Sequence, residues 1–320
     1  MKRLLLLSLL ITAAILCIPI LSDKTGIYDN APSNSTKKAE RLPGDASRTI
    51  RLASGDEVTE ISVKDYLVGV VAAEMPASFE SEALKAQAVA ARSYLQRALS
   101  NGTKHESCDI CADSGCCQAY KSDAELKELW GDKYTAYIAR IEEAVEDTDG
   151  EYISYNGEPA LAVFHSSSCG TTENSGAVWN ELPYLTSVDT PETEKDVPNF
   201  VSKLSLSELD FRDTVLYGRP AADMTGEAKS WIGEIKRDAA GRVESIVIGG
   251  ESFSGSELRS LFSLRSTDFE LEHTGSGFVF TVKGYGHGVG MSQYGANIMA
   301  KNGADYKEIL AHYYPGTVLS

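Results

Sequence analysis

The sequence predicts an α+β fold, with a helical lobe that carries a candidate catalytic acid, a β-rich lobe, and a substrate groove between the two. Apolar residues recur every three or four positions in segments 62–74 and 81–100, which is the spacing of one helix face. After residue 151 the pattern changes to strand-like alternation around short turns. Helices that come early and strands that come late favour α+β over a doubly wound parallel sheet.

The N-terminus predicts a membrane anchor. Lys2 and Arg3 precede an uncharged, mostly apolar run from Leu4 to Leu21. At about 1.5 Å per residue, a helix over this run would span roughly 27 Å, close to one bilayer core. No clear Ala-x-Ala cleavage site follows, so residues 1–22 are expected to form an uncleaved signal-anchor, with a cleaved signal peptide as the alternative. Since the basic pair keeps the N-terminus cytoplasmic, the protein is expected in the cell membrane as a single-pass protein whose remaining chain is extracytoplasmic.

The rest of the chain divides into a linker and a folded region. Residues 23–47 are polar and contain two Pro, which predicts a linker. Residues 48–320 are long enough for one large domain or two tightly joined lobes, and they contain no repeats. The net charge of −16 argues against nucleic acid as a partner, because binding it requires clustered Lys and Arg.

The first half is expected to be mostly helical. Ser62 begins a helix as its N-cap, and Pro76 disfavours helical geometry at the residue before it, so this helix should end near Glu74. In chain order the elements predicted here are a hairpin over 49–53 and 58–61, helices over 62–74 and 81–100, a Cys-rich loop over 101–119, and helices over 122–130 and 132–146.

The second half is expected to consist mainly of strand pairs. Asn156-Gly157 between two apolar segments is a strong type I′ hairpin signal. The predicted elements are hairpins over 151–155 and 158–164, over 231–238 and 243–248, and over 268–272 and 278–283, with helices over 255–262, 291–301 and 305–313.

Glu74 is the candidate catalytic residue. Leu67, Val71 and Glu74 are spaced i, i+4 and i+7, so a helix places the carboxylate on its apolar stripe. Burial and the negative end of the helix dipole should both raise the pKa of Glu74. A carboxylic acid that is still protonated near neutral pH can act as a general acid. The alternative is a Glu that only borders the end of the helix.

The Cys-rich loop is a candidate metal site. His105, Cys111 and Cys117 are spaced by six and six residues, and Cys108 and Cys116 are additional thiols in the same loop. One imidazole and two thiolates suit a soft divalent ion such as zinc. Disulfide bonding is the alternative, because the chain is expected outside the cytosol.

Two segments of the second half carry candidate ligand-binding residues. One contains His165 and Ser167 after a strand, and the other is the glycine-rich run 284–296 with His287, Ser292, Gln293 and Tyr294. The glycines permit unusual backbone angles and close approach to a ligand, although a tight structural crossover explains them equally well. Gly-x-Ser-x-Gly is absent, and so is a convincing Ser-His-Asp triad.

Several motifs together resemble the stage II sporulation protein D family. They are Ala73-Glu74-Met75-Pro76, the segment from Glu82 to Tyr94, Cys117-Gln118-Ala119-Tyr120, Phe164-His165 with the following serines, Gly286 to Ala296, and Ile309 to Thr317. They occur in order over about 48–320. The resemblance implies that 48–320 is a catalytic domain of this family.

What the resemblance implies is a lytic transglycosylase of peptidoglycan. It would cut the bond between N-acetylmuramic acid and N-acetylglucosamine in glycan strands without stem peptides and leave 1,6-anhydro ends, with Glu74 as the single acid and base. The setting would be the sporulation septum during engulfment, together with a cell-wall amidase and a membrane partner. The alternative is a module that binds glycan without cutting it and activates an amidase.

The resemblance also implies roles for other residues. Zinc would be bound by His105, Cys111 and Cys117, whereas Cys108, Cys116 and Cys169 depart from the family pattern. Arg92 and Ser93 are expected to contact the sugar or Glu74. The candidate residues of the second half are expected to line the groove, and they are His165, Ser167, His287, Ser292, Gln293 and Tyr294. A zinc hydrolase built on the three metal ligands is a further alternative.

Overall fold

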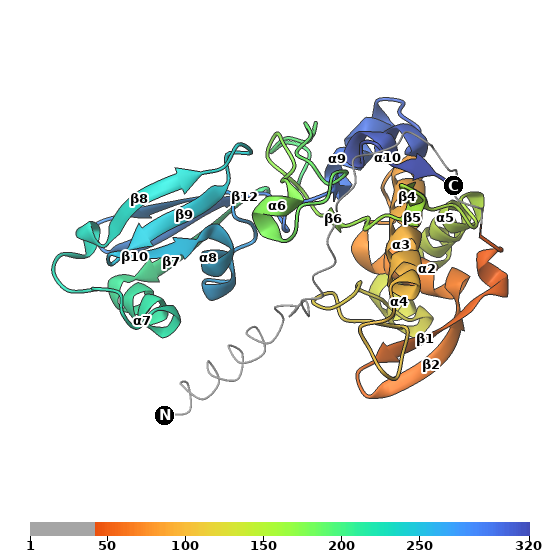
Figure 1. Cartoon of the computed structure of the whole chain (residues 1–320), viewed down its shortest axis with the longest axis horizontal. Coiled ribbons are helices and arrows are strands. Elements are labelled where there is room, and N and C mark those ends of the chain that lie inside the picture. The colour runs from red at the N-terminus through yellow and green to blue at the C-terminus, as the bar shows by residue number, and fades with distance from the viewer. Residues whose placement is uncertain (1–41) are drawn as a thin grey trace. The chain divides into compact units, whose positions relative to one another are not determined.

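The computed structural model describes residues 42–320, so the predicted anchor and most of the predicted linker lie outside the described residues. The predicted α+β class is confirmed (Figure 1). Among the described residues, no helix has the length and apolar character needed to cross a membrane. The chain forms two compact units. The first extends to Ala162 and includes Gly316–Ser320, and the second covers Val163–Pro315. The predicted groove between two lobes stays a prediction.

The first unit is mainly helical. Its elements are η1 (Asp45–Ser47), β1 (Thr49–Ser54), β2 (Glu57–Ser62), α2 (Val63–Glu74), α3 (Ser81–Ser100), β3 (Ile110–Cys111), α4 (Asp123–Trp130), η2 (Gly131–Lys133), α5 (Tyr134–Asp147), β4 (Ile153–Tyr155), β5 (Glu158–Pro159) and β14 (Val318–Leu319). The strands form two sheets in the orders β2-β1-β3 and β14-β4-β5. Every element predicted for the first half is present, with ends within about two residues of the prediction.

Three helices, α2, α3 and α5, form the core of this unit. The predicted cap of α2 is confirmed, because Ser62 Oγ accepts a hydrogen bond from the Asp65 amide at 3.0 Å. At the other end Met75 is extended, with a φ of −123°, so the helix ends at Glu74, two residues before Pro76. The Ala-rich α3 is buried on most of its surface because small side chains let its neighbours approach closely.

A buried ion pair ties α3 to the start of the folded region. Arg92 is fully buried, and its guanidinium contacts Asp45 at 2.7 Å while donating to the carbonyls of Glu151 and Val145. Ser93 is also fully buried between Val89 and Ile153. The contacts with sugar or Glu74 expected of Arg92 and Ser93 are therefore corrected to structural roles, since neither side chain has an exposed atom left for a ligand. Asp45 belongs to this core, so the folded region begins before the predicted boundary at residue 48.

The second unit is built on two three-stranded sheets, in the orders β10-β9-β8 and β11-β12-β7. Its elements are β6 (Phe164–His165), α6 (Ser175–Val178), β7 (Val201–Ser207), α7 (Glu208–Gly218), η3 (Ala228–Ser230), β8 (Ile232–Arg237), β9 (Val243–Ile248), β10 (Glu251–Ser254), α8 (Gly255–Leu261), β11 (Phe269–His273), β12 (Gly277–Lys283), β13 (Met291–Ser292), α9 (Gln293–Lys301) and α10 (Tyr306–Tyr313). An aromatic core joins the elements from β7 to β12, and in it Phe211 stacks on Phe278 with ring centroids 3.8 Å apart. Five of these elements were absent from the sequence-based prediction, namely α6, β7, α7, η3 and β10, and the residues of β13 were predicted as the start of a helix.

The glycine-rich run packs against its own chain. Gly284, Gly286, Gly288 and Gly290 all have positive φ. A Cβ on Gly290 would lie 2.1 Å from the carbonyl oxygen of Val163, and one on Gly284 would lie 2.7 Å from that of Ser167. The space beside these glycines is thus filled by backbone. This outcome supports the structural crossover and not the close approach of a ligand.

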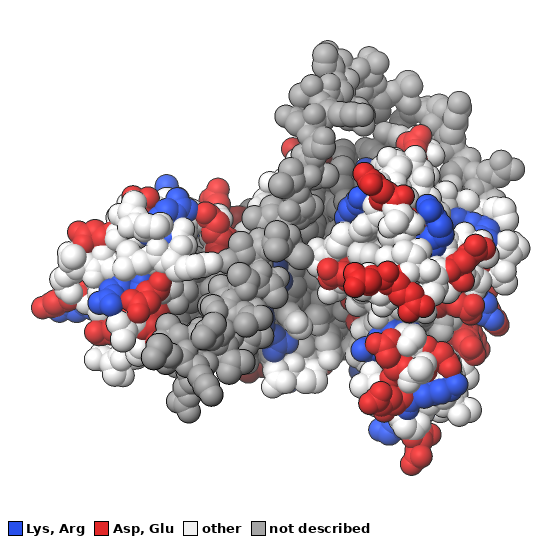
Figure 2. Space-filling model, turned by 90° about the horizontal axis from the view of Figure 1, so that it is seen from below, with Lys and Arg blue, Asp and Glu red and all other residues white. Residues whose placement is uncertain are grey.

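The surface charge follows the composition. Figure 2 shows Asp and Glu over much of the visible face of the described part, with Lys and Arg scattered among them instead of gathered into a patch. Such a surface gives no footprint for nucleic acid on that face.

Candidate active site

Glu74 is the last residue of α2 and is half-buried. Burial raises the pKa of its carboxyl above the ordinary value, and the backbone N–H of Ala119, which donates to Oε1 at 2.9 Å, partly opposes this shift. The predicted burial of the acid is confirmed. One hydrogen bond from a neutral donor leaves the other oxygen available to carry and deliver a proton.

The segment that supplies the Ala119 N–H lies along α2. Gln118 accepts a hydrogen bond from Tyr66 at 3.0 Å, and the Lys121 amide donates to the Gly69 carbonyl at 3.2 Å. Between these contacts Tyr120 stacks on Tyr66, with ring centroids 6.1 Å apart. We call residues 118–121 the clamp segment. It positions the donor to Glu74 by three further contacts with the same helix.

We predict that Gly69→Ala destabilises the protein, although Ala is the better helix former. A Cβ at Gly69 would lie 2.2 Å from the ring of Tyr120 and 2.7 Å from the carbonyl oxygen of Lys121. Such overpacking costs about 1–3 kcal/mol, which exceeds the gain of about 1 kcal/mol in helix propensity. Urea unfolding measures the change. In the double variant Gly69→Ala/Tyr120→Ala the two costs should be less than additive, and full additivity would contradict the proposed clash.

The candidate metal ligands come together in the loop between α3 and α4. The ligand atoms of His105, Cys111, Cys116 and Cys117 all lie within 4.8 Å of one another, and we call these four residues the thiol cluster. His105 Nε2 is 3.4 Å from Cys117 Sγ and 3.7 Å from Cys116 Sγ, and the two sulfurs are 3.9 Å apart. Cys116, which the sequence analysis left as an additional thiol, thus joins the three predicted ligands.

The separations among His105, Cys116 and Cys117 fit a tetrahedral zinc ion. Bonds of about 2.3 Å to sulfur and about 2.0 Å to nitrogen place two sulfurs about 3.8 Å apart and sulfur and nitrogen about 3.5 Å apart. All cysteines in the described part of the chain are free thiols, so no disulfide is found there. Cys108 is buried and lies outside the cluster. The cluster can therefore bind a metal ion, and the donor set favours a soft one.

The thiol cluster directly precedes the clamp segment. Cys117 is followed by Gln118 and Ala119. Earlier in the same loop, Cys111 lies on β3 and pairs with Ala53 of the parallel strand β1. A metal ion in the cluster would tie Cys117 to Cys111 on β3 and so restrain the Ala119 N–H that donates to Glu74.

A surface pocket of about 280 Å³ lies beside the acid. Its lining consists of Ala72, Ala73, Glu74, Met75, Pro76, Ala77, Leu129 and Trp130. Glu74 is the only ionisable group in this lining. The pocket thus combines apolar walls with one carboxyl group, which is the pattern of a ligand site with a single polar anchor.

The six predicted residues of the second unit come from three places, and most of them are buried. His165 and Ser167 lie on and just after β6, His287 lies in the glycine-rich loop between β12 and β13, and Ser292, Gln293 and Tyr294 lie at the end of β13 and the start of α9. His165 donates from Nδ1 to the Val289 carbonyl and accepts at Nε2 from Ser168, and burial holds its pKa well below the usual range. Ser292 donates to Glu192. These internal partners assign structural roles to His165 and Ser292. Ser167 and Gln293 are likewise buried.

Two of the six reach the surface. His287 and Tyr294 are half-buried. Burial lowers the pKa of His287 to about 3, so its imidazole is neutral at any physiological pH, and the exposed Trp179 packs edge-on against it at 4.9 Å. Sugar contacts by His287 and Tyr294 stay predictions.

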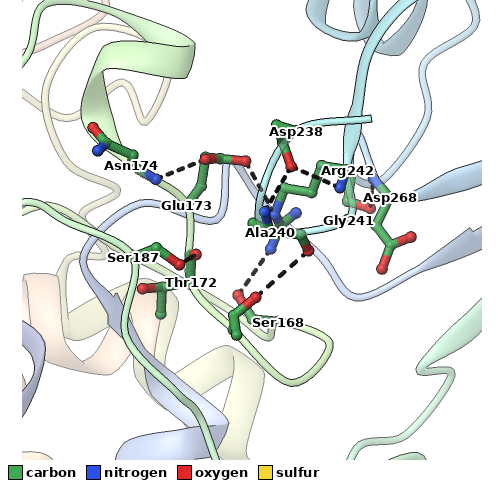
Figure 3. A network of polar contacts seen from close by, with 12 residues as sticks. Ser168, Thr172, Glu173, Asn174, Ser187, Asp238, Ala240, Gly241, Arg242 and Asp268 are labelled. Carbon is green, nitrogen blue, oxygen red and sulfur yellow. Dashed lines mark hydrogen bonds and ion pairs between the residues drawn. The ribbon is translucent and has the colours of Figure 1, made fainter. Parts of the chain in front are cut away.

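A polar network in the second unit was missed by the sequence analysis (Figure 3). Arg242 is buried, donates to Ser168 at 3.0 Å and lies 3.6 Å from a carboxylate oxygen of Glu173. Burial, together with nearby Asp238, raises the pKa of Glu173 to about 7. Arg242 lies just after a predicted turn, where no periodicity marks a buried charge.

Comparisons with known proteins agree on one family. The family model described as "SpoIID: Stage II sporulation protein" matches residues 53–155. Stage II sporulation protein D of Bacillus subtilis (strain 168) is 36% identical over 303 residues, 93% of this chain and 85% of the relative. The protein of the same name from Bacillus amyloliquefaciens is 34% identical over 324 residues, 98% of this chain and 92% of the relative. An amidase enhancer of Bacillus subtilis is 32% identical over 305 residues, 79% of this chain and 40% of that protein.

Proposed function

Since this chain belongs to the stage II sporulation protein D family, whose members act in sporulation, we propose that it is a lytic transglycosylase of peptidoglycan. The observation that carries the proposal is a half-buried Glu74 with a raised pKa as the only carboxyl group of its pocket. Glycosidases that use water or a covalent intermediate need a second carboxylate across the bond. A reaction in which a hydroxyl of the sugar itself is the nucleophile needs only one carboxyl group.

In the proposed reaction Glu74 donates its proton to the glycosidic oxygen between N-acetylmuramic acid and N-acetylglucosamine. The C1–O bond breaks and positive charge develops at C1. The Glu74 carboxylate then takes the proton of the C6 hydroxyl on the same muramic ring, and O6 bonds to C1. The product has a 1,6-anhydro end, no water is consumed, and the acid is regenerated. The Ala119 N–H stabilises the carboxylate in the intermediate stage.

The test is the mass of the products. The full-length protein in detergent is incubated with glycan strands from which the stem peptides have been removed. A transglycosylase releases fragments with anhydro ends, each lighter by one water than the hydrolytic product. Reducing ends in their place would contradict the proposal and indicate a hydrolase.

We further propose that the thiol cluster binds zinc in a structural role. Four protein ligands complete a tetrahedral shell, whereas catalytic zinc keeps one position open for water. This argues against a zinc hydrolase built on His105, Cys111 and Cys117. Bound zinc would crosslink the loop that leads into the clamp segment. The ion would take no part in proton transfer.

Chelation should therefore lower the stability of the protein, because the free energy of metal binding is part of the free energy of folding. At free zinc about a thousandfold above the dissociation constant, binding stabilises the folded state by about 4 kcal/mol. The melting temperature with and without chelator measures the effect, and added zinc should restore it. Cys108→Ala, which changes a buried thiol outside the cluster, should retain one zinc per chain. An unchanged melting temperature after complete metal removal would exclude the structural role.

A second candidate function is a glycan-binding module that activates a cell-wall amidase without cutting. The similarity to an amidase enhancer favours it. Glycan binding without any anhydro ends, combined with faster peptide release by an added cell-wall amidase, would support this function over the first. Both candidates act outside the cytosol, at the sporulation septum, with the predicted N-terminal anchor and a membrane partner retaining the protein there.

A further inference from the structure

The pocket at Glu74 has a second wall that the proposed chemistry does not use. Leu129 and Trp130, the last two residues of α4, complete its lining. Leu129 is 60% exposed, the joint highest value among the exposed large apolar residues in the described part of the chain. An exposed apolar side chain beside an indole, both in the wall of a concave site, is typical of a binding surface.

The indole of Trp130 is held in place by its neighbours on α5. Tyr137 meets it edge-on, with ring centroids 5.5 Å apart and an interplanar angle of 90°, and Tyr134 lies at 6.4 Å. Tyr134 in turn donates a hydrogen bond to Asp123 at the start of α4. A side chain fixed in this way loses little conformational entropy when a ligand packs on it.

The start of α4 is equally well defined. Ser122 and Glu125 form a complete capping box, and Gly131, with a φ of +49°, ends the helix directly after Trp130. Since only glycine adopts such angles readily, the chain turns at the point that presents Trp130 to the pocket. These contacts set the direction of the wall independently of any ligand.

We propose that Trp130 and Leu129 form a sugar-binding platform that holds one pyranose ring of the glycan beside Glu74. A pyranose presents C–H groups on its faces and hydroxyls around its edge. An aromatic face matches the former and leaves the latter in water or near polar groups. The pocket has the matching composition, since its side chains are apolar or aromatic apart from the carboxyl group of Glu74. This inference rests on the proposed glycan substrate and adds the residues that position it.

The platform contacts the sugar equally before and during bond cleavage, so it contributes to binding and not to the chemical step. Trp130→Ala should therefore raise the KM for denuded glycan strands roughly tenfold and leave kcat within a few-fold of the wild type. Trp130→Phe, which keeps an aromatic face, should recover most of the affinity. Tyr217→Ala, which removes an exposed aromatic residue of α7 in the second unit, should change neither constant.

Binding measured in a Glu74→Gln background separates the platform from catalysis. With denuded strands as the probe, the dissociation constant should rise roughly tenfold on adding Trp130→Ala. Leu129→Asp covers the case in which Trp130→Ala loses its fold, because Leu129 is mostly exposed and its loss should weaken binding without unfolding. Unchanged binding and KM in folded platform variants overturn the inference while leaving the transglycosylase intact. If the wild-type protein never cuts glycan but its glycan binding depends on the platform, the platform is supported and the transglycosylase proposal is overturned.

Discussion

Replacing Glu74 by Gln should abolish the release of anhydro ends while leaving glycan binding intact. The amide has the shape of the acid and can still accept the Ala119 N–H, but it has no proton to give to the glycosidic oxygen. General acid and base catalysis contributes about 10²- to 10⁴-fold to a rate, and here one group performs both steps. Product release from denuded strands, counted by mass spectrometry, measures the loss. A Glu74→Gln protein that cuts at the wild-type rate would remove the acid from this site.

The pH dependence provides an independent check on the same residue. Burial raises the pKa of Glu74, and only its protonated form can start the reaction. Activity should therefore fall as pH rises through this raised pKa, and the descending limb should lie at higher pH than for an ordinary Glu, whose pKa is about 4.3.

Stability should change in the same direction as activity. Because the folded state binds the Glu74 proton more tightly than the unfolded chain, ionisation costs stability as pH rises above the unfolded value. Glu74→Gln should thus be more stable than the wild type near neutral pH and equal to it in acid below both pKa values. Urea unfolding at several pH values gives this comparison.

Replacing Arg92 by Leu should destabilise the protein severely, by about 3–5 kcal/mol, because it leaves the buried carboxylate of Asp45 without its partner. The carbonyls of Val145 and Glu151 lose their donors at the same time. Chemical unfolding measures the free energy. The double variant Arg92→Leu/Asp45→Leu should recover part of the loss, since it removes the unpaired charge.

A matched control is Arg212→Ala. Arg212 pairs with Asp213 on the surface, with both side chains more than 40% exposed, so its removal should change stability by no more than about 0.5 kcal/mol. The sequence-based expectation of a sugar contact makes a different prediction for Arg92, namely a raised KM in a fully stable protein. A stable Arg92→Leu variant with weakened substrate binding would restore that expectation.

The helices of the first unit were predictable because their patterns are local. The spacing of Leu67, Val71 and Glu74, with Ser62 before it and Pro76 after it, contains what is needed to begin α2, to end it and to orient the acid. Strands β7 and β12 show the opposite case. Their pairing joins residues 70 (Ser207 and Gly277) to 82 (Val201 and Lys283) positions apart, and no short-range signal marks it. Local patterns were therefore sufficient for α2 but not for that sheet.

The site was predictable only in part for the same reason. Arg92 lies on a helix whose other residues are mostly small and buried, and its role depends on Asp45, which is far away in the sequence. The sequence did not indicate Trp130 as a site residue, because a Trp at the end of a short amphipathic helix is usually a packing residue. Its importance depends on the pocket that it shares with Glu74, and that proximity is a property of the fold. Cys116 was counted as an additional thiol because sequence spacing does not show which sulfurs converge.

The connectivity of the first unit has a consequence for synthesis. Strand β14 completes the β14-β4-β5 sheet, yet all of Val163–Pro315 lies between β5 and β14 in the chain. A polypeptide made from its N-terminus cannot close this sheet until the whole inserted unit has been produced, and the closure brings together residues that are very distant along the chain. The inserted unit has its own aromatic core and can acquire structure earlier. The helix that holds Glu74 is thus among the first parts of the folded region to be translated, whereas the sheet of its own unit is completed among the last.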